Sequence, residues 1–191
     1  MNEQHILIET LGLSHFCIKE KNPIEVLKNE FSILDLSNIQ IVNKIDWSFI
    51  YEKDDNSKNF ILLTDLNDWS YLIWKYWDFN SNIELAKRLS KKLKTKVNYY
   101  FLDSHIATSR WIFSDNGIVT RAYFESHGIR LFDEGFNEIE NEVRKSIQET
   151  FVEDIFWDLY DKTCNSIEFV NKQKRSKLTV FTGTFSDNKQ L

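Results

Sequence analysis

The sequence predicts an α+β fold in which a mainly antiparallel sheet carries helices packed against one face. Two observations support this class. An amphipathic helix is followed by four short strand-like runs with turn signals between them, which is typical of a helix and a four-strand meander. The helices also do not alternate regularly with strands, which disfavours a parallel Rossmann-like sheet. We expect six to nine strands in one domain spanning residues 1–191.

Runs rich in apolar and aromatic residues predict strands in the N-terminal half, at 6–13, 39–42, 47–52, 60–64 and 69–76. Asn22 and Pro23 favour the start of a helix that extends to about residue 32, because Asn can cap a helix and Pro fits its first turn.

The clearest helix is predicted at 80–94, with Asn80 or Ser81 as the cap and Glu84 as the capping-box partner of Ser81. The meander follows at 97–102, 106–114, 118–124 and 129–132. Asn116-Gly117 lies between its second and third strands and is the strongest short signal for a hairpin.

After the meander the chain becomes strongly acidic. The segment at about 133–161, which is predicted to be mainly helical, contains ten acidic residues and two basic ones. Helices are predicted at 137–146 and 150–160, and a final strand at 178–185. Two interpretations of this segment remain open: a solvated helical face, or a surface for a basic partner.

Composition limits the function classes. The formal net charge of −5 disfavours nucleic-acid binding through a basic face. No stretch has the length and apolar character of a membrane span, and the N-terminus lacks the pattern of a signal peptide, so we expect a cytoplasmic protein. Cys17 and Cys164 are expected to be free thiols.

No common catalytic, phosphate-binding or metal-binding motif is present, so we expect no cofactor and no metal. The best local candidate for catalysis is Asp103 with His105, since a carboxylate two residues from an imidazole on a strand can orient it. With Arg121 these residues form the alternative hypothesis of a small hydrolase or nucleotide-processing enzyme.

Aromatic residues make up 15% of the chain and are most concentrated at 69–77. On a strand, Trp69, Tyr71 and Trp77 point to one face and Trp74 to the other. Two interpretations remain open. The rings form an exposed binding surface, because Trp and Tyr dominate interface hot spots, or the strand is central and covered on both faces.

A set of short motifs lies within the segment 80–135: Ser104-His105, Trp111, Asn116-Gly117, Arg121-Ala122-Tyr123 and Leu131-Phe132-Asp133-Glu134-Gly135. With these motifs the segment resembles a group of uncharacterised bacterial proteins that look like immunity or accessory proteins of polymorphic toxins. The resemblance implies an immunity or accessory role, and it implies no catalytic residue.

These observations favour a protein-binding function, that of an immunity or antitoxin-like protein that occludes a basic toxin domain. The expected contact residues are Trp69, Tyr71, Trp74, Trp77, Glu149, Glu153 and Asp154. An accessory protein of a phage or defence system, also acting by binding, is the remaining alternative.

Overall fold

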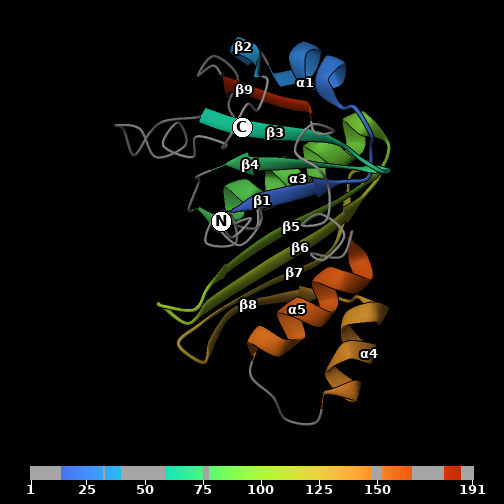
Figure 1. The fold of residues 1–191 in the computed structure, drawn as a ribbon. Coiled ribbons are helices and arrows are strands. Elements are labelled where there is room, and N and C mark those ends of the chain that lie inside the picture. The colour runs from blue at the N-terminus through green and yellow to red at the C-terminus, as the bar shows by residue number, and fades with distance from the viewer. Residues whose placement is uncertain are drawn as a thin grey trace, which may run out of the picture.

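The computed structural model describes residues 14–31, 33–39, 59–74, 78–147, 152–164 and 179–185. Nine strands of these segments form one sheet in which every neighbouring pair is antiparallel. The sheet order is β2-β9-β3-β4-β1-β5-β6-β7-β8 (Figure 1). The fold is therefore α+β with helices packed on an antiparallel sheet, as predicted.

The elements have these bounds in chain order: β1 His15–Ile18, α1 Ile24–Phe31, β2 Ile33–Ile39, β3 Asn59–Leu66, β4 Trp69–Trp74, α3 Phe79–Leu93, β5 Lys96–Asp103, β6 Thr108–Asp115, β7 Ile118–Ser126, β8 Ile129–Gly135, α4 Glu138–Ser146, α5 Val152–Thr163 and β9 Thr179–Phe185. None of the helices in the described segments is long and apolar enough to cross a membrane.

Most predicted elements correspond to observed ones. The meander of β5 to β8 follows α3 as expected, and β9 matches the predicted final strand. The predicted strand at 6–13 and nearly all of those at 39–42 and 47–52 lie outside the described residues. The short strand β1 and the strand β2 were not predicted.

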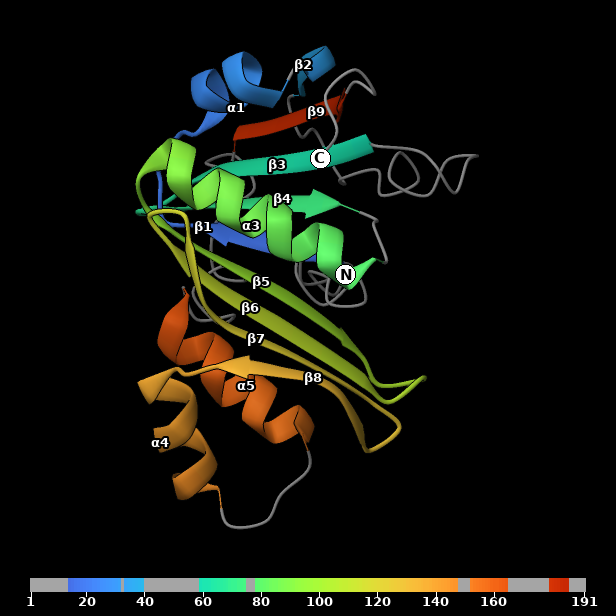
Figure 2. The ribbon, with the colours of Figure 1, turned by 180° about the vertical axis from the view of Figure 1, so that it is seen from behind.

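Both faces of the sheet are covered, so the prediction of helices on one face is wrong. Helices α1 and α3 lie on one face, and α4 and α5 lie on the other, toward the β8 end (Figures 1 and 2). Period-two alternation distributes the side chains of β4 between two cores: Leu72 and Trp74 face α3, while Tyr71 and Ile73 lie on the α5 side.

The cap of α3 also differs from the prediction. Asp78 is the N-cap, and its carboxylate accepts a hydrogen bond from the backbone N–H of Ser81 at 2.9 Å. Asn80 and Ser81 already belong to the helix, which begins at Phe79. The competing signal was the carboxylate of Asp78, two residues before Asn80, which satisfies the exposed N–H groups at the start of the helix.

The predicted hairpin between β6 and β7 is confirmed. Asn116 and Gly117 have φ values of +49° and +86°, as the two central residues of a type I′ turn require. Gly117 also lies close to α3, since a Cβ atom there would stand 2.8 Å from the Cβ of Lys91. The turn therefore fixes the distance between the hairpin and the helix.

Candidate functional site

Helices α4 and α5 form a layer over the β5–β8 half of the sheet (Figure 1). Four apolar or aromatic side chains of α5 point inward and are buried: Ile155, Phe156, Leu159 and Tyr160. Val143 of α4 is buried in the same core. The inner faces of both helices are thus used for packing, and their outer faces remain available.

The outer faces of these two helices are acidic. Their exposed charged side chains comprise two lysines, Lys145 and Lys162, and six carboxylates, which we call the acidic helical surface: Glu138, Glu142, Glu153, Asp154, Asp158 and Asp161. Asp154, Asp158 and Asp161 follow the i, i+4, i+7 spacing that places side chains along one side of a helix.

A half-buried tryptophan lies beside these carboxylates and packs against the core. Trp157 packs edge-on against Phe156, with ring centroids 5.2 Å apart and an interplanar angle of 89°. Helical spacing places Glu153, Asp154 and Asp161 next to it. An anchored aromatic ring bordered by charged groups is a common composition for a protein interface.

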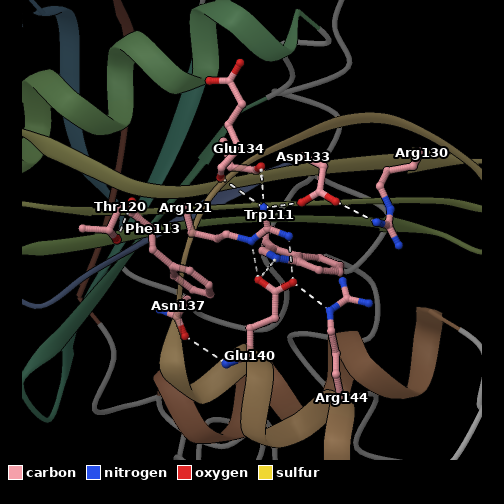
Figure 3. Close-up of polar contacts among 11 residues, drawn as sticks. Trp111, Phe113, Thr120, Arg121, Arg130, Asp133, Glu134, Asn137, Glu140 and Arg144 are labelled. Atoms are coloured by element: carbon pink, nitrogen blue, oxygen red, sulfur yellow. Dashed lines mark hydrogen bonds and ion pairs between the residues drawn. The ribbon is translucent and has the colours of Figure 1, made fainter.

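A buried ion-pair network attaches α4 to the sheet, with Glu140 at its centre (Figure 3). The Glu140 carboxylate accepts hydrogen bonds from Nε and Nη2 of Arg121 at 2.7 and 2.9 Å, in a bidentate arrangement. It also accepts from Nε1 of Trp111 and Nε of Arg144, each at 2.9 Å. One helical side chain therefore contacts strands β6 and β7 at once.

The network continues to β8. Arg121 also forms an ion pair with Asp133, whose second oxygen accepts from Nη1 of Arg130 at 2.8 Å. Arg121 Nη1 donates to the Glu134 carbonyl oxygen at 3.1 Å. The guanidinium of Arg121 thereby joins β7, β8 and α4.

Stacked rings support the charged groups. The rings of Trp111 and Tyr123 stack with centroids 4.2 Å apart and planes 14° apart. The Arg144 guanidinium lies 4.9 Å from the centre of the Tyr123 ring, within the range of cation–π attraction. These contacts restrict the guanidinium groups to the geometry that the carboxylates need.

The pKa shifts follow from this arrangement. Burial opposes ionisation of Glu140, but the hydrogen bonds and charge of Arg121, with Trp111 and Arg144, outweigh it and lower the carboxyl pKa below its ordinary value. Burial likewise opposes ionisation of Asp133, and contacts with Arg121 and Arg130 lower its pKa. Both carboxylates are thus held ionised by arginines, which suits a structural anchor and not a general acid.

The predicted aromatic contact residues lie mainly in the core. Tyr71 and Trp74 are buried, with exposed fractions of 0% and 2%, so the expectation of exposed rings is wrong for both. Trp69 is half-buried and packs against the core on the α5 side. Trp77 lies outside the described residues. The central strand covered on both faces is the correct interpretation for β4.

The predicted acidic contact residues have different outcomes. Glu153 and Asp154 are exposed in the first turn of α5. Glu149 lies outside the described residues. The part of the acidic segment that the structure describes therefore presents carboxylates outward, with the exceptions of Glu140 and the half-shielded Asp133.

Asp103, His105 and Arg121 do not converge. Asp103 pairs with Thr108 of β6 and Arg121 with Phe113. These positions lie five residues apart along β6, about 17 Å at the usual rise of a strand. The cause is the hairpin geometry, because Asp103 ends β5 at one turn while Arg121 lies near the opposite end of β7.

Asp103 has a local role instead. Its Oδ1 accepts from the backbone N–H groups of His105 and Ile106 at 2.9 and 3.4 Å, and the His105 side chain is exposed. Arg121 lines a cavity of about 400 Å³ with Ile83, Val119 and Phe132, and neither Asp103 nor His105 borders it. Within the described segments, no group of three or more His, Cys, Asp or Glu side chains could hold a metal ion.

Sequence reasoning missed the centre of the network, Glu140, and its contacts with Trp111 and Arg144. One local signal was present: Asn137 caps α4, so Glu140 is the third helical residue, a position where Glu commonly reaches back to the cap. The Asn137 side chain accepts from the Glu140 N–H at 2.9 Å, while the Glu140 carboxylate points to the sheet. The contact of Glu140 with Arg121, which lies 19 residues earlier in the chain, could not be predicted from local spacing.

Comparison of the chain with family models, with curated proteins and with solved structures finds no match in any of the three.

Proposed function

We propose that this protein binds a basic protein partner through the acidic helical surface, in the manner of an immunity or antitoxin-like protein that covers a toxin's functional face. Six exposed carboxylates on α4 and α5, against two exposed lysines, support a basic partner. Opposite charge on two surfaces speeds their association and rejects wrong partners.

The position of two carboxylates on α5 carries the proposal. Glu153 and Asp154 in the first turn favour the helix dipole, so helix stability alone accounts for them. Asp158 and Asp161 lie in the C-terminal half, where the dipole disfavours negative charge. Both are exposed, and Asp161 lies one helical turn after the half-buried Trp157, a composition that favours contact with a partner protein.

The buried network supports the same function by fixing α4. A binding surface that is already ordered loses less conformational entropy on association. Glu140 joins α4 to Arg121 and Trp111 on two strands, and Val143 packs in the core. The outer carboxylates of α4, Glu138 and Glu142, are therefore presented from an anchored helix.

The partner class follows from the charge. A toxin domain that acts on nucleic acid carries a basic face to neutralise phosphates. An acidic helical surface can cover such a face and exclude the substrate. Binding of this kind is expected to weaken as salt rises, because screening acts on exposed charges.

The test is affinity capture from the native cell, with the tagged chain as bait. The binding variant carries Asp154→Asn, Asp158→Asn and Asp161→Asn, and a matched control carries Glu25→Gln, Asp68→Asn and Glu84→Gln at exposed sites elsewhere. Both variants change the net charge equally. We expect the wild type and the control to capture one basic protein that the binding variant does not retain.

Neutralisation completes the test. Co-expression with the captured protein should protect cells from its toxicity for the wild type and the control, and fail for the binding variant. Equal capture by all three chains would contradict the surface assignment. A captured protein that is harmless when expressed alone would contradict the immunity role.

A further inference from the structure

The fold brings together the only two cysteines of the chain, which lie near opposite ends of the sequence. Cys17 is in the middle of β1 and is fully buried, whereas Cys164 follows the last residue of α5 and is half-buried. Both are free thiols. Cys164 packs against the core that contains Cys17.

Several contacts fix the end of α5 above Cys17. Asn98 lies directly opposite Cys17 on β5, and its side-chain N–H donates to the Thr163 carbonyl oxygen at 3.0 Å. The same amide reaches Sγ of Cys164 at 3.7 Å. Sγ of Cys17 lies 3.7 Å from the hydroxyl of Tyr160, one helical turn before Cys164.

The two thiols differ in access to solvent. Burial, and after it the contact with the Cys164 thiol, raise the pKa of Cys17 well above its ordinary value, so Cys17 stays protonated in the core. Cys164 is half-buried, so it is the more accessible of the two thiols to small reagents. The outer thiol can therefore react first and the inner one second.

We propose that Cys17 and Cys164 are a redox modification site, at which a peroxide converts the two thiols into an intramolecular disulfide that joins α5 to β1. In the first step hydrogen peroxide oxidises the Cys164 thiol to a sulfenic acid and releases one water. In the second, the Cys17 sulfur attacks the sulfenic sulfur and loses its proton, the hydroxyl group leaves with that proton as a second water, and the S–S bond forms. A thiol reductant reverses the reaction by exchange.

The disulfide links elements that are distant in sequence and adjacent in the fold. Such a cross-link mainly restricts the unfolded chain, so the oxidised protein should have a Tm higher by at least about 5 °C. The inference does not depend on the proposed function. It does bear on it, since α5 carries four of the six carboxylates of the acidic helical surface.

The experiment treats the purified, folded chain with hydrogen peroxide and then counts free thiols after denaturation. We expect both thiols to be lost in a monomer, with the mass of two hydrogen atoms removed and the peptides holding Cys17 and Cys164 joined. Dithiothreitol should restore both thiols and the original Tm. Conversion of the sulfenic acid to the disulfide should be at least about tenfold faster in the folded chain than in urea, because the fold holds the two cysteines near each other.

Two variants serve as controls. Cys164→Ser changes only the half-exposed member and should leave the Cys17 thiol unreactive in the folded chain, while Cys17→Ala should oxidise Cys164 without a cross-link. The proposal is overturned by cross-linked dimers in place of the internal bond, by over-oxidation of Cys164 with Cys17 still free, or by a lower Tm of the oxidised chain. Each of these readouts is independent of any partner protein.

Discussion

At the scale of single residues, Glu140 is the side chain on which the attachment of α4 depends most. It is 3% exposed and is contacted by Arg121, Arg144 and Trp111. Replacing it with Gln removes the carboxylate that Arg121 and Arg144 share, although Arg121 keeps its ion pair with Asp133, and we expect a loss of about 3 kcal/mol in the free energy of unfolding. Urea denaturation measures this loss.

The matched control is Glu142→Gln, two residues further along the same helix and exposed. Surface substitutions of this kind usually change stability by less than about 0.5 kcal/mol. Equal losses for the two variants would show that the network does not stabilise the fold.

The lowered pKa of Glu140 makes the same contribution dependent on pH. In the unfolded chain the carboxyl titrates near its ordinary value of 4.5, and in the folded chain it titrates below that value. The stabilisation is therefore fully present above about pH 4.5 and is lost as the pH falls through the folded pKa. The stability difference between wild type and Glu140→Gln should shrink in that acidic range, as urea denaturation at pH 7 and pH 3 can measure. A difference that stays constant between the two pH values would contradict the ion pair.

At the scale of elements, the junction between β8 and α4 depends on Gly135. Its φ is +78°, and a Cβ atom there would lie 2.2 Å from the carbonyl oxygen of Thr120. The N–H of Phe136 donates to that same oxygen at 2.8 Å, so the close approach sets where the chain leaves the sheet. Gly135→Ala should displace this junction and loosen α4.

Gly128 offers a matched comparison, because its φ is +74° but a Cβ atom would meet nothing within 4 Å. Gly128→Ala should lower the free energy of unfolding by about 1 kcal/mol, because only the positive φ disfavours alanine there. Gly135→Ala should lower the free energy of unfolding by at least about 2 kcal/mol more than Gly128→Ala, because the backbone at Thr120 must also move. Thermal unfolding of the two variants measures the difference, and similar Tm values would contradict the role of the close approach.

At the scale of the whole molecule, coverage of both sheet faces explains the aromatic content of the chain. Each face needs its own core, and buried rings occur in both: Tyr100 and Trp111 on the α5 side, and Phe16 and Tyr99 on the α3 side. Of the rings that suggested an exposed surface at 69–77, Tyr71 and Trp74 are buried in these two cores. The aromatic residue beside the carboxylates of the acidic helical surface is Trp157 of α5, which is half-buried and packs against the core.

Local patterns predicted the parts of the fold in which neighbours in sequence are neighbours in space. The meander, its Asn116-Gly117 turn and the amphipathic α3 are of this kind. The four-residue β1 is too short to show a period, and its place between β4 and β5 depends on pairing with both. The Glu140 network and the contact between Cys17 and Cys164 are likewise set by tertiary structure.

The acidity of α4 and α5 could be read directly from the sequence, and Glu153 and Asp154 were predicted as part of it. Which carboxylates are buried could not be read, because Glu140 and Glu142 differ only in the helix face they occupy. The outward position of Asp158 and Asp161 follows from the inward packing of Phe156 and Tyr160.

The central claim, that the acidic helical surface binds a basic partner, is tested most directly by association kinetics with the captured partner over a range of salt concentrations. We expect the Asp154→Asn, Asp158→Asn and Asp161→Asn chain to associate at least about tenfold more slowly than the wild type at low salt, with a flatter salt dependence. The matched charge control on the other elements should retain the wild-type rate and slope. Identical rates and slopes for the three chains would contradict the claim.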